Sequence, residues 1–168
     1  MSDISTRMNE LGFYTLPGAP KSPHDLLAEV ADAEAMGLGA CFISERFNIK
    51  EAVTLSGAVG AVSTNVGIAT AATNHNTRHP LVTASYATTM HRLTGGRFTL
   101  GIGRGIEALY RAYGMPPITT AQMEDFAGVM RRLFKGVFYP SNCTSSIFIQ
   151  IIFSRFALVS TKTSPGNN

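Results

Sequence analysis

The stretch 66–105 constrains the fold of this chain more than any other, because it alternates uncharged apolar runs with polar loops. It opens with 66–72, whose small and β-branched residues are typical of a strand that is buried on both faces in a parallel sheet. A polar segment, 73–78, follows this run. Pro80 then favours the first turn of a helix, where its missing N–H would be unpaired anyway. The stretch therefore predicts a strand, a polar loop and a helix in that order.

The helix that begins near Pro80 is expected to present an apolar stripe to a core. Four large residues recur in it at helical spacing, namely Val82, Tyr86, Met90 and Leu93. The pair Gly95–Gly96 is expected to end the helix. A second apolar run, 98–102, follows and leads into the polar loop 103–105. Polar residues thus gather after both strands, which is where α/β folds place their sites.

The remainder of the chain up to residue 136 shows the same alternation. The expected strands are 11–16, 40–43, 66–72 and 97–102, and the expected helices are 22–37, 50–63, 80–93 and 119–136. Ser22 and Thr119 are good N-cap residues, and Gln122 is placed for a capping box with Thr119. Strands and helices that alternate with short connections indicate parallel strands joined by right-handed crossovers. We therefore expect an α/β fold of about four βα units.

Three motifs carry a resemblance to a known family. They are SERFNIKEA at 44–52, TNHNTRHP at 73–80 and LTGGRFTLGIGRG at 93–105, in this order along the chain. Together they resemble the bacterial-luciferase-like flavin oxidoreductases, in particular the branch that depends on the deazaflavin coenzyme F420. The likeness covers residues 11–136. It implies a (β/α)8 TIM barrel.

The chain is short for that fold. A complete (β/α)8 barrel usually needs about 250 residues, whereas this sequence has 168. We therefore expect residues 1–136 to form the N-terminal half of a luciferase-like barrel, truncated to about four βα units. Residues 137–168 read as a divergent apolar tail that does not resemble the family.

The apolar part of this tail, 147–159, is too short and too interrupted to span a membrane. Its apolar residues would leave a strand apolar on nearly both faces. We expect it to pack against the open edge or the interior of the half-barrel. Because a half-barrel exposes the apolar face that further strands would cover, we also expect the chain to self-associate or form a homo-oligomer.

Composition narrows the function classes. Hydrophobic residues make up 45% of the sequence and charged residues 15%, which suits a sizeable core and argues against overall disorder. The net charge is +3 and the basic residues are scattered, so no nucleic acid partner is expected. The two cysteines fit neither a disulfide framework nor a metal site. The N-terminus is polar and lacks a signal peptide pattern, and a cytoplasmic protein that contacts no membrane is the expectation.

The first candidate site residues, Glu45 and Arg46, follow the second expected strand. In the resembling family this pair is usually Asp-His, where the acid helps to hold the deazaflavin and the histidine donates a proton in some members. Glu45 keeps the carboxylate, whereas Arg46 cannot act as an acid near neutral pH, although it can orient an anion. The alternative interpretation of both residues is a surface ion pair.

Two further groups follow the third and fourth strands. Ala71, Ala72 and Thr73 end the third strand. The resemblance implies a non-proline cis peptide in this region, near Thr70, Ala71 and Ala72, that supports the flavin ring from behind; the alternative is an ordinary strand end. It also implies that Arg104 and Gly105 approach the tail or the ring of the cofactor. Some members of the family carry an acid at the position of Ile106, and its absence here weakens the case for proton transfer.

Two other patterns in these loops do not support a site. His75 and His79 would share a helical face, but Pro80 keeps His79 out of the helix, so a zinc site is not expected and His79 is expected to cap the helix. The glycines of 101–105 have the spacing GxGxG rather than GxGxxG, which argues against a dinucleotide fingerprint.

The resemblance implies an oxidoreductase that transfers a hydride between coenzyme F420 and a small organic substrate, with the cofactor carrying the redox chemistry. FMN is the alternative cofactor, as in an FMN-dependent monooxygenase of the same family. A second hypothesis is a catalytically inactive half-barrel that associates through its open sheet edge.

Overall fold

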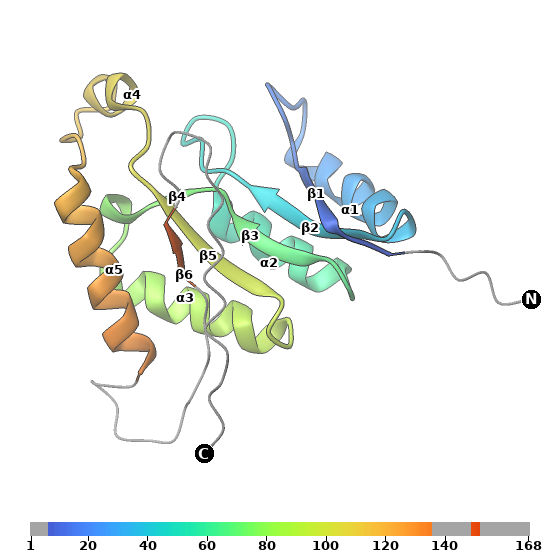
Figure 1. The fold of residues 1–168 in the computed structure, drawn as a ribbon. Helices are drawn as coiled ribbons and strands as arrows, with labels where there is room; N and C mark the ends of the chain where they lie inside the picture. The colour runs from blue at the N-terminus through green and yellow to red at the C-terminus, as the bar shows by residue number, and fades with distance from the viewer. Residues whose placement is uncertain (1–6, 136–148, 152–168) are drawn as a thin grey trace, which may run out of the picture.

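The computed structural model describes residues 7–135 and 149–151, and these residues form one sheet backed by helices (Figure 1). The strands are β1 (Met8–Tyr14), β2 (Leu38–Ile43), β3 (Gly67–Thr70), β4 (Thr73–Asn74), β5 (Phe98–Gly103) and β6 (Ile149–Ile151). The helices are α1 (Leu26–Ala35), α2 (Ala52–Val62), α3 (Pro80–Leu93), α4 (Glu107–Ala112) and α5 (Thr120–Phe134), with 3-10 turns at Pro23–Asp25 and His75–Thr77.

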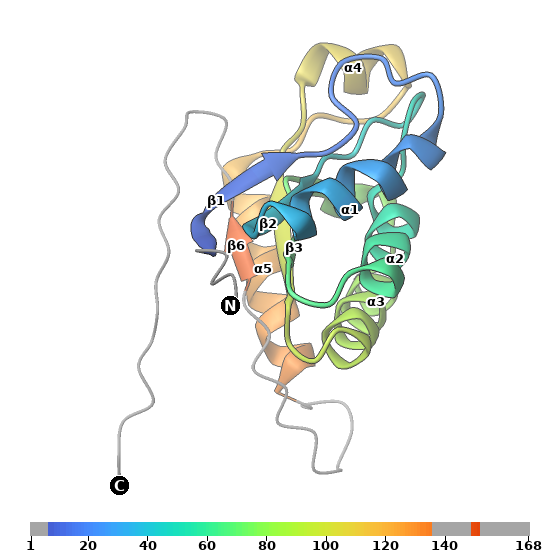
Figure 2. The same ribbon diagram turned by 90° about the vertical axis from the view of Figure 1, so that its right-hand side faces the viewer.

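Every ladder between the named strands is parallel. Starting from β1, the order is β1-β2-β3-β5. β3 pairs with β5 at Phe98 and Thr99, and β4 pairs with β5 further along, at Ile102 and Gly103. β3 and β4 are therefore two parts of one interrupted strand, here called the β3–β4 line. The helices α1, α2 and α3 lie together on one face of the sheet (Figure 2). This arrangement confirms the predicted parallel α/β fold with alternating strands and helices.

The core lies between the sheet and the helices, with α5 contributing to it as well. Val30 of α1, Ile43 of β2, Phe98 of β5 and Met123 of α5 are among its fully buried side chains. Their removal from water is the main stabilising term, at about 1.5–3 kcal/mol for each large side chain. Inside the sheet, Thr70 bridges two strands, since its Oγ1 donates to the carbonyl of Gly101 and accepts from the N–H of the same residue, both at 2.8 Å.

The apolar stripe expected on α3 is wrong in part. Met90 is buried, but Val82 and Leu93 are 56% and 60% exposed. The buried face consists instead mainly of smaller residues, namely Thr83, Ala84, Ala87 and Met90. Small side chains let α3 approach α2 closely, where a Cβ on Gly60 would lie 3.2 Å from the methyl carbon of Met90. Close helix packing therefore selected a different face from the one that large residues indicate.

The predicted helix caps are confirmed. Ser22 accepts from the N–H of His24 at 3.1 Å, and Nδ1 of His79 accepts from the N–H of Leu81 at 3.2 Å. Thr119 and Gln122 form the expected capping box at the start of α5. The sequence thus predicted the starts of these helices well, because capping chemistry is local.

β6 extends the sheet past β5. Residues 149–151 pair with Leu100, Gly101 and Ile102, on the opposite side of β5 from β4. This pairing agrees with the prediction that the apolar tail lies along the open sheet edge. The rest of the tail, and with it the expected boundary at residue 136, lies outside the described residues. Within the described residues, no helix is long and apolar enough to cross a membrane.

Candidate cofactor site

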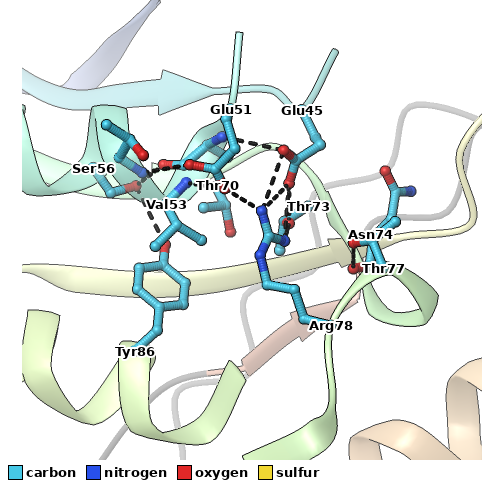
Figure 3. A network of polar contacts seen from close by, with 12 residues as sticks. Glu45, Glu51, Val53, Ser56, Thr70, Thr73, Asn74, Thr77, Arg78 and Tyr86 are labelled. Carbon is cyan, nitrogen blue, oxygen red and sulfur yellow. Dashed lines mark hydrogen bonds and ion pairs between the residues drawn. The ribbon is translucent and has the colours of Figure 1, made fainter. Parts of the chain in front are cut away.

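The carboxylate of Glu45 is the centre of a polar cluster at the carboxyl ends of the strands (Figure 3). Its side chain is 0% exposed. One oxygen, Oε2, accepts from Nη1 and Nη2 of Arg78, each at 3.1 Å, and from the hydroxyl of Thr73. The other, Oε1, accepts from Nη2 of Arg78 and from the N–H of Ala52 at the start of α2, both at 3.3 Å. Glu45 therefore joins the β2 end, β4 and α2.

Arg78 also pairs with a second carboxylate, that of Glu51. Its Nη2 donates to Glu51, which caps α2 by accepting from the N–H groups of Val53 and Thr54 at 3.0 and 2.6 Å. Burial alone would lower the pKa of Arg78, but hydrogen bonds and attraction to Glu45 and Glu51 raise it above its usual value. Arg78 is thus a permanent cation that holds two glutamates in place.

The segment between β3 and β4 contains the expected cis peptide, which lies between Ala71 and Ala72. The carbonyl of Ala72 accepts from the N–H of Glu45 at 3.1 Å, and the N–H of Ala71 donates to the carbonyl of Ile43 at 2.7 Å. The predicted location of the bond is confirmed. Any support that it gives to a cofactor ring stays a prediction.

Arg46 points away from this cluster. Its Nη1 donates to the carbonyl of Gly18 at 2.5 Å, in the loop that follows β1. The alternative of a surface ion pair between Glu45 and Arg46 does not hold in this structure, because the ion-pair partner of Glu45 is Arg78.

The loop after β5 approaches the cluster through Asn74. The side chain of Asn74 is buried and donates to the carbonyl of Gly103 at 3.0 Å. Gly105 has φ +74°, and a Cβ there would lie 2.2 Å from the ring of Tyr110 and 3.0 Å from the amide nitrogen of Asn74. Only glycine fits this position, since it tolerates both the backbone and the contact. Arg104 beside it is exposed.

Two buried polar atoms near this edge have no hydrogen-bond partner among the described residues. They are the hydroxyl of Tyr110 and Nδ1 of His75. Tyr110 is 2% exposed, and burial together with the nearby charge of Glu45 raises its pKa to about 12. His75 stacks on Phe126 with ring centres 5.0 Å apart, and burial lowers its pKa. Both groups are neutral near pH 7.

The structure brings most of the predicted site residues to one edge. Glu45, Ala71, Ala72, Thr73, Arg104 and Gly105 all lie at the carboxyl ends of β2, the β3–β4 line or β5. Arg78 and Tyr110 were missed as site residues. Arg78 stood in the polar loop 73–78, and Tyr110 lies between the expected strand 97–102 and the expected helix 119–136, where no element was predicted. A usable signal existed for Arg78, since a carboxylate that follows a buried strand needs a cationic partner if it is to be buried.

Comparison with known proteins identifies the family. The model of the luciferase-like monooxygenase family matches residues 8–147. A 5,10-methylenetetrahydromethanopterin reductase from Methanopyrus kandleri is 30% identical over 101 residues, which are 57% of this chain and 29% of the relative. The match therefore covers less than a third of the length of that relative.

Solved structures agree on the fold. The coenzyme F420-dependent tetrahydromethanopterin reductase from Methanopyrus kandleri superposes with a TM-score of 0.64 and 18% identity, covering 85% of this chain and 48% of the other. The oxygenating constituent of 3,6-diketocamphane monooxygenase from Pseudomonas putida, solved in complex with FMN, gives 0.66 and 20%, covering 74% and 39%. The described sheet is thus part of a TIM barrel of this type. The chain belongs to the luciferase-like monooxygenase family.

Proposed function

We propose that this chain forms the first half of a cofactor site in an oxidoreductase that transfers a hydride between coenzyme F420 and a small organic substrate. The observation that carries the proposal is the gathering of Glu45, Thr73, Arg78 and Gly105 at the carboxyl ends of adjacent parallel strands. This is the face at which (β/α)8 enzymes hold their ligands.

The residues at this edge suit a planar heterocycle. The Tyr110 hydroxyl and Nδ1 of His75 are buried polar atoms without a partner among the described residues, and a ring with carbonyl and N–H groups offers partners to both. When bound, a deazaflavin supplies the hydride chemistry itself. The exposed guanidinium of Arg104 is available to the anionic tail of such a cofactor.

Glu45 has a positioning role in this proposal. Both of its oxygens are already occupied by Arg78, Thr73 and the N–H of Ala52. A carboxylate with these partners holds the loop after β2, β4 and the start of α2 together. It is not available to exchange a proton with a substrate. Arg46 contacts Gly18 and cannot donate a proton near neutral pH.

FMN is the alternative cofactor. The relative from Pseudomonas putida was solved with FMN, and its fold matches this chain as well as the F420-dependent reductase does. An FMN-dependent monooxygenase of the same family therefore remains the second candidate function.

Titration of the purified chain with coenzyme F420 and with FMN, followed by cofactor fluorescence, tests the proposal. We expect F420 to bind more tightly. The variant Arg104→Ala should weaken binding about tenfold, the equivalent of one charge-assisted hydrogen bond. Arg131→Ala, an exposed arginine on α5, is the matched control and should bind as the parent chain does.

The outcomes separate the hypotheses. Preferential binding of FMN would favour the monooxygenase. Binding of neither cofactor by a chain that light scattering shows to be associated would favour the inactive half-barrel. The assembly state is measured in the same samples, so that weak binding by a monomer is distinguished from a site blocked by association.

A further inference from the structure

A second polar cluster lies beside the Glu45 cluster, at the carboxyl ends of β1 and β2. Tyr14 ends β1, and Ser44 directly follows β2. The Tyr14 hydroxyl donates to Oγ of Ser44. The ammonium nitrogen of Lys50, which precedes α2, lies 4.6 Å from the centre of the Tyr14 ring. Two loops that are far apart in sequence thus place a phenol, an alcohol and a cation together.

Backbone carbonyls hold the Lys50 ammonium in place. The residue is 5% exposed, and Nζ donates to the carbonyls of Thr15 and Leu16 at 2.7 and 2.9 Å. No carboxylate bonds it within the described residues. The nearby Glu29 instead accepts from the N–H of Leu16 and the hydroxyl of Thr15. Neutral carbonyls therefore hold the Lys50 ammonium in a fixed place over the ring of Tyr14.

Tyr14 is open to a small molecule. It is 41% exposed, although Lys50 beneath it is buried. Its hydrogen-bond partner, Ser44, is the residue before Glu45, so the phenol stands at the same edge as the proposed cofactor site. The phenol is therefore exposed on one side while a buried cation lies against its ring.

The proposed reaction needs a proton donor that the expected positions do not supply. Reduction of a carbonyl adds a hydride to carbon and a proton to oxygen. Arg46 cannot give up a proton near neutral pH, and Ile106 has none to give. We infer that the Tyr14 hydroxyl donates this proton to the substrate oxygen, with Ser44 and Lys50 holding it in position. The inference rests on the proposed function and names the carbonyl-alcohol pair as the substrate class.

A deazaflavin bound here in its reduced form would supply the hydride, with both electrons, that adds to the carbonyl carbon. The C–O π bond breaks, and the oxygen takes the proton of the Tyr14 hydroxyl to give the alcohol. The phenolate that remains has the Lys50 ammonium over its ring. The Ser44 hydroxyl, which accepts from Tyr14 in the structure, would then turn to donate to it. Since Tyr14 is exposed, water returns a proton to it.

Nitration by tetranitromethane tests the cluster without cofactor or turnover. The rate of nitration reports the surroundings of each phenol, and the Lys50 ammonium lies over the ring of Tyr14. Tyr113 is the internal control, because it is 42% exposed and Tyr14 is 41% exposed. We expect peptide mass spectrometry to show Tyr14 nitrated about threefold faster or more than Tyr113, and Lys50→Met to remove the difference.

Ser44→Ala provides a second variant, because Lys50→Met leaves two buried carbonyls unbonded and can fail to fold. It should slow nitration of Tyr14 and leave Tyr113 unchanged. Equal nitration of Tyr14 and Tyr113 in the parent chain, or rates unaffected by Ser44→Ala, would overturn the inference.

Turnover gives the second readout. With reduced coenzyme F420 and a small ketone, Tyr14→Phe should lower kcat about 100-fold or more while cofactor affinity stays within about twofold. Tyr113→Phe should leave both unchanged. Normal turnover by Tyr14→Phe would contradict the role of Tyr14 and leave the proposed function intact. Failure of the parent chain to bind F420 would overturn the proposed function and the hydride step, and nitration would still decide whether the cluster activates Tyr14.

Discussion

The carboxylate of Glu45 and the guanidinium of Arg78 lie 3.1 Å apart, and the Glu45 side chain is 0% exposed while that of Arg78 is 18% exposed. The two residues belong to loops that follow β2 and β4, so their pairing ties neighbouring strand ends together. Thr73 and the N–H of Ala52 use the remaining acceptor capacity of the carboxylate. The pair is thus a structural anchor of the edge at which we place the cofactor.

Removing one partner of this pair should be strongly destabilising. Arg78→Met leaves Glu45 charged, buried and without its cation, and we expect a loss of about 3–5 kcal/mol in the free energy of unfolding. Urea denaturation followed by circular dichroism measures it. Arg111→Met is the control, because its pair with Glu107 is 71% and 61% exposed and should contribute less than about 1 kcal/mol. Equal losses in the two variants would contradict this reading.

Stability should depend on pH through Glu34. Its oxygens accept from the N–H groups of Asn65 and Val66 at 2.8 and 2.6 Å and from the hydroxyl of Thr64 at 2.9 Å. Burial alone would raise its pKa, but these bonds lower it from 4.5 to about 2. Because the folded pKa is the lower one, the stabilisation is fully present above the unfolded value and disappears as pH falls towards 2.

We expect Glu34→Gln to lose about 1–3 kcal/mol at pH 7, since hydrogen bonds to a charged acceptor become neutral ones. Denaturant unfolding of both chains at pH 7 and at pH 3 checks this. The gap between parent and variant should narrow at the lower pH. A gap that stays constant or widens on acidification would show that Glu34 does not act through its charge.

Gly105→Ala should be costly in a way that Gly114→Ala is not. Both glycines have positive φ, +74° and +68°, so alanine is strained by about 1–2 kcal/mol at either position. Only at Gly105 would the new Cβ also meet Tyr110, at 2.2 Å, whereas nothing lies within 4 Å at Gly114. We expect an additional loss of about 1–3 kcal/mol for Gly105→Ala. Thermal unfolding compares the two variants, and equal midpoints would rule out the contact with Tyr110 as the cause.

Removal of the tail should expose β5. Residues 149–151 pair with Leu100, Gly101 and Ile102 of β5. In a chain ending at Gly136, this side of β5 would have no partner strand and would become an exposed apolar edge of the sheet. We expect this shortened chain to unfold at lower temperature and to associate more strongly than the parent chain in light-scattering measurements. A shortened chain that is equally stable and equally dispersed would show that β6 does not protect the sheet.

The sequence alone determined the order of the main strands and helices and where several helices begin, whereas α4 was not predicted. Alternating apolar runs and polar loops predicted parallel strands with crossover helices, and local capping residues such as His79 and Thr119 marked where helices begin. The motifs also placed the candidate site residues in loops that the structure brings to one edge of the sheet. These features depend on residues within a few positions of one another in the chain, so they can be predicted without knowledge of the tertiary contacts.

Only the tertiary structure decided which side chains meet. Arg78 became the partner of Glu45, and Lys50 lies over Tyr14, because parallel strands bring separate loops to one edge. The buried face of α3 contains Ala84 and Ala87, whereas Val82 and Leu93 are exposed, because close packing against α2 favours small residues. Local pattern cannot report such choices, because they depend on the shape and charge of surfaces that are distant in sequence.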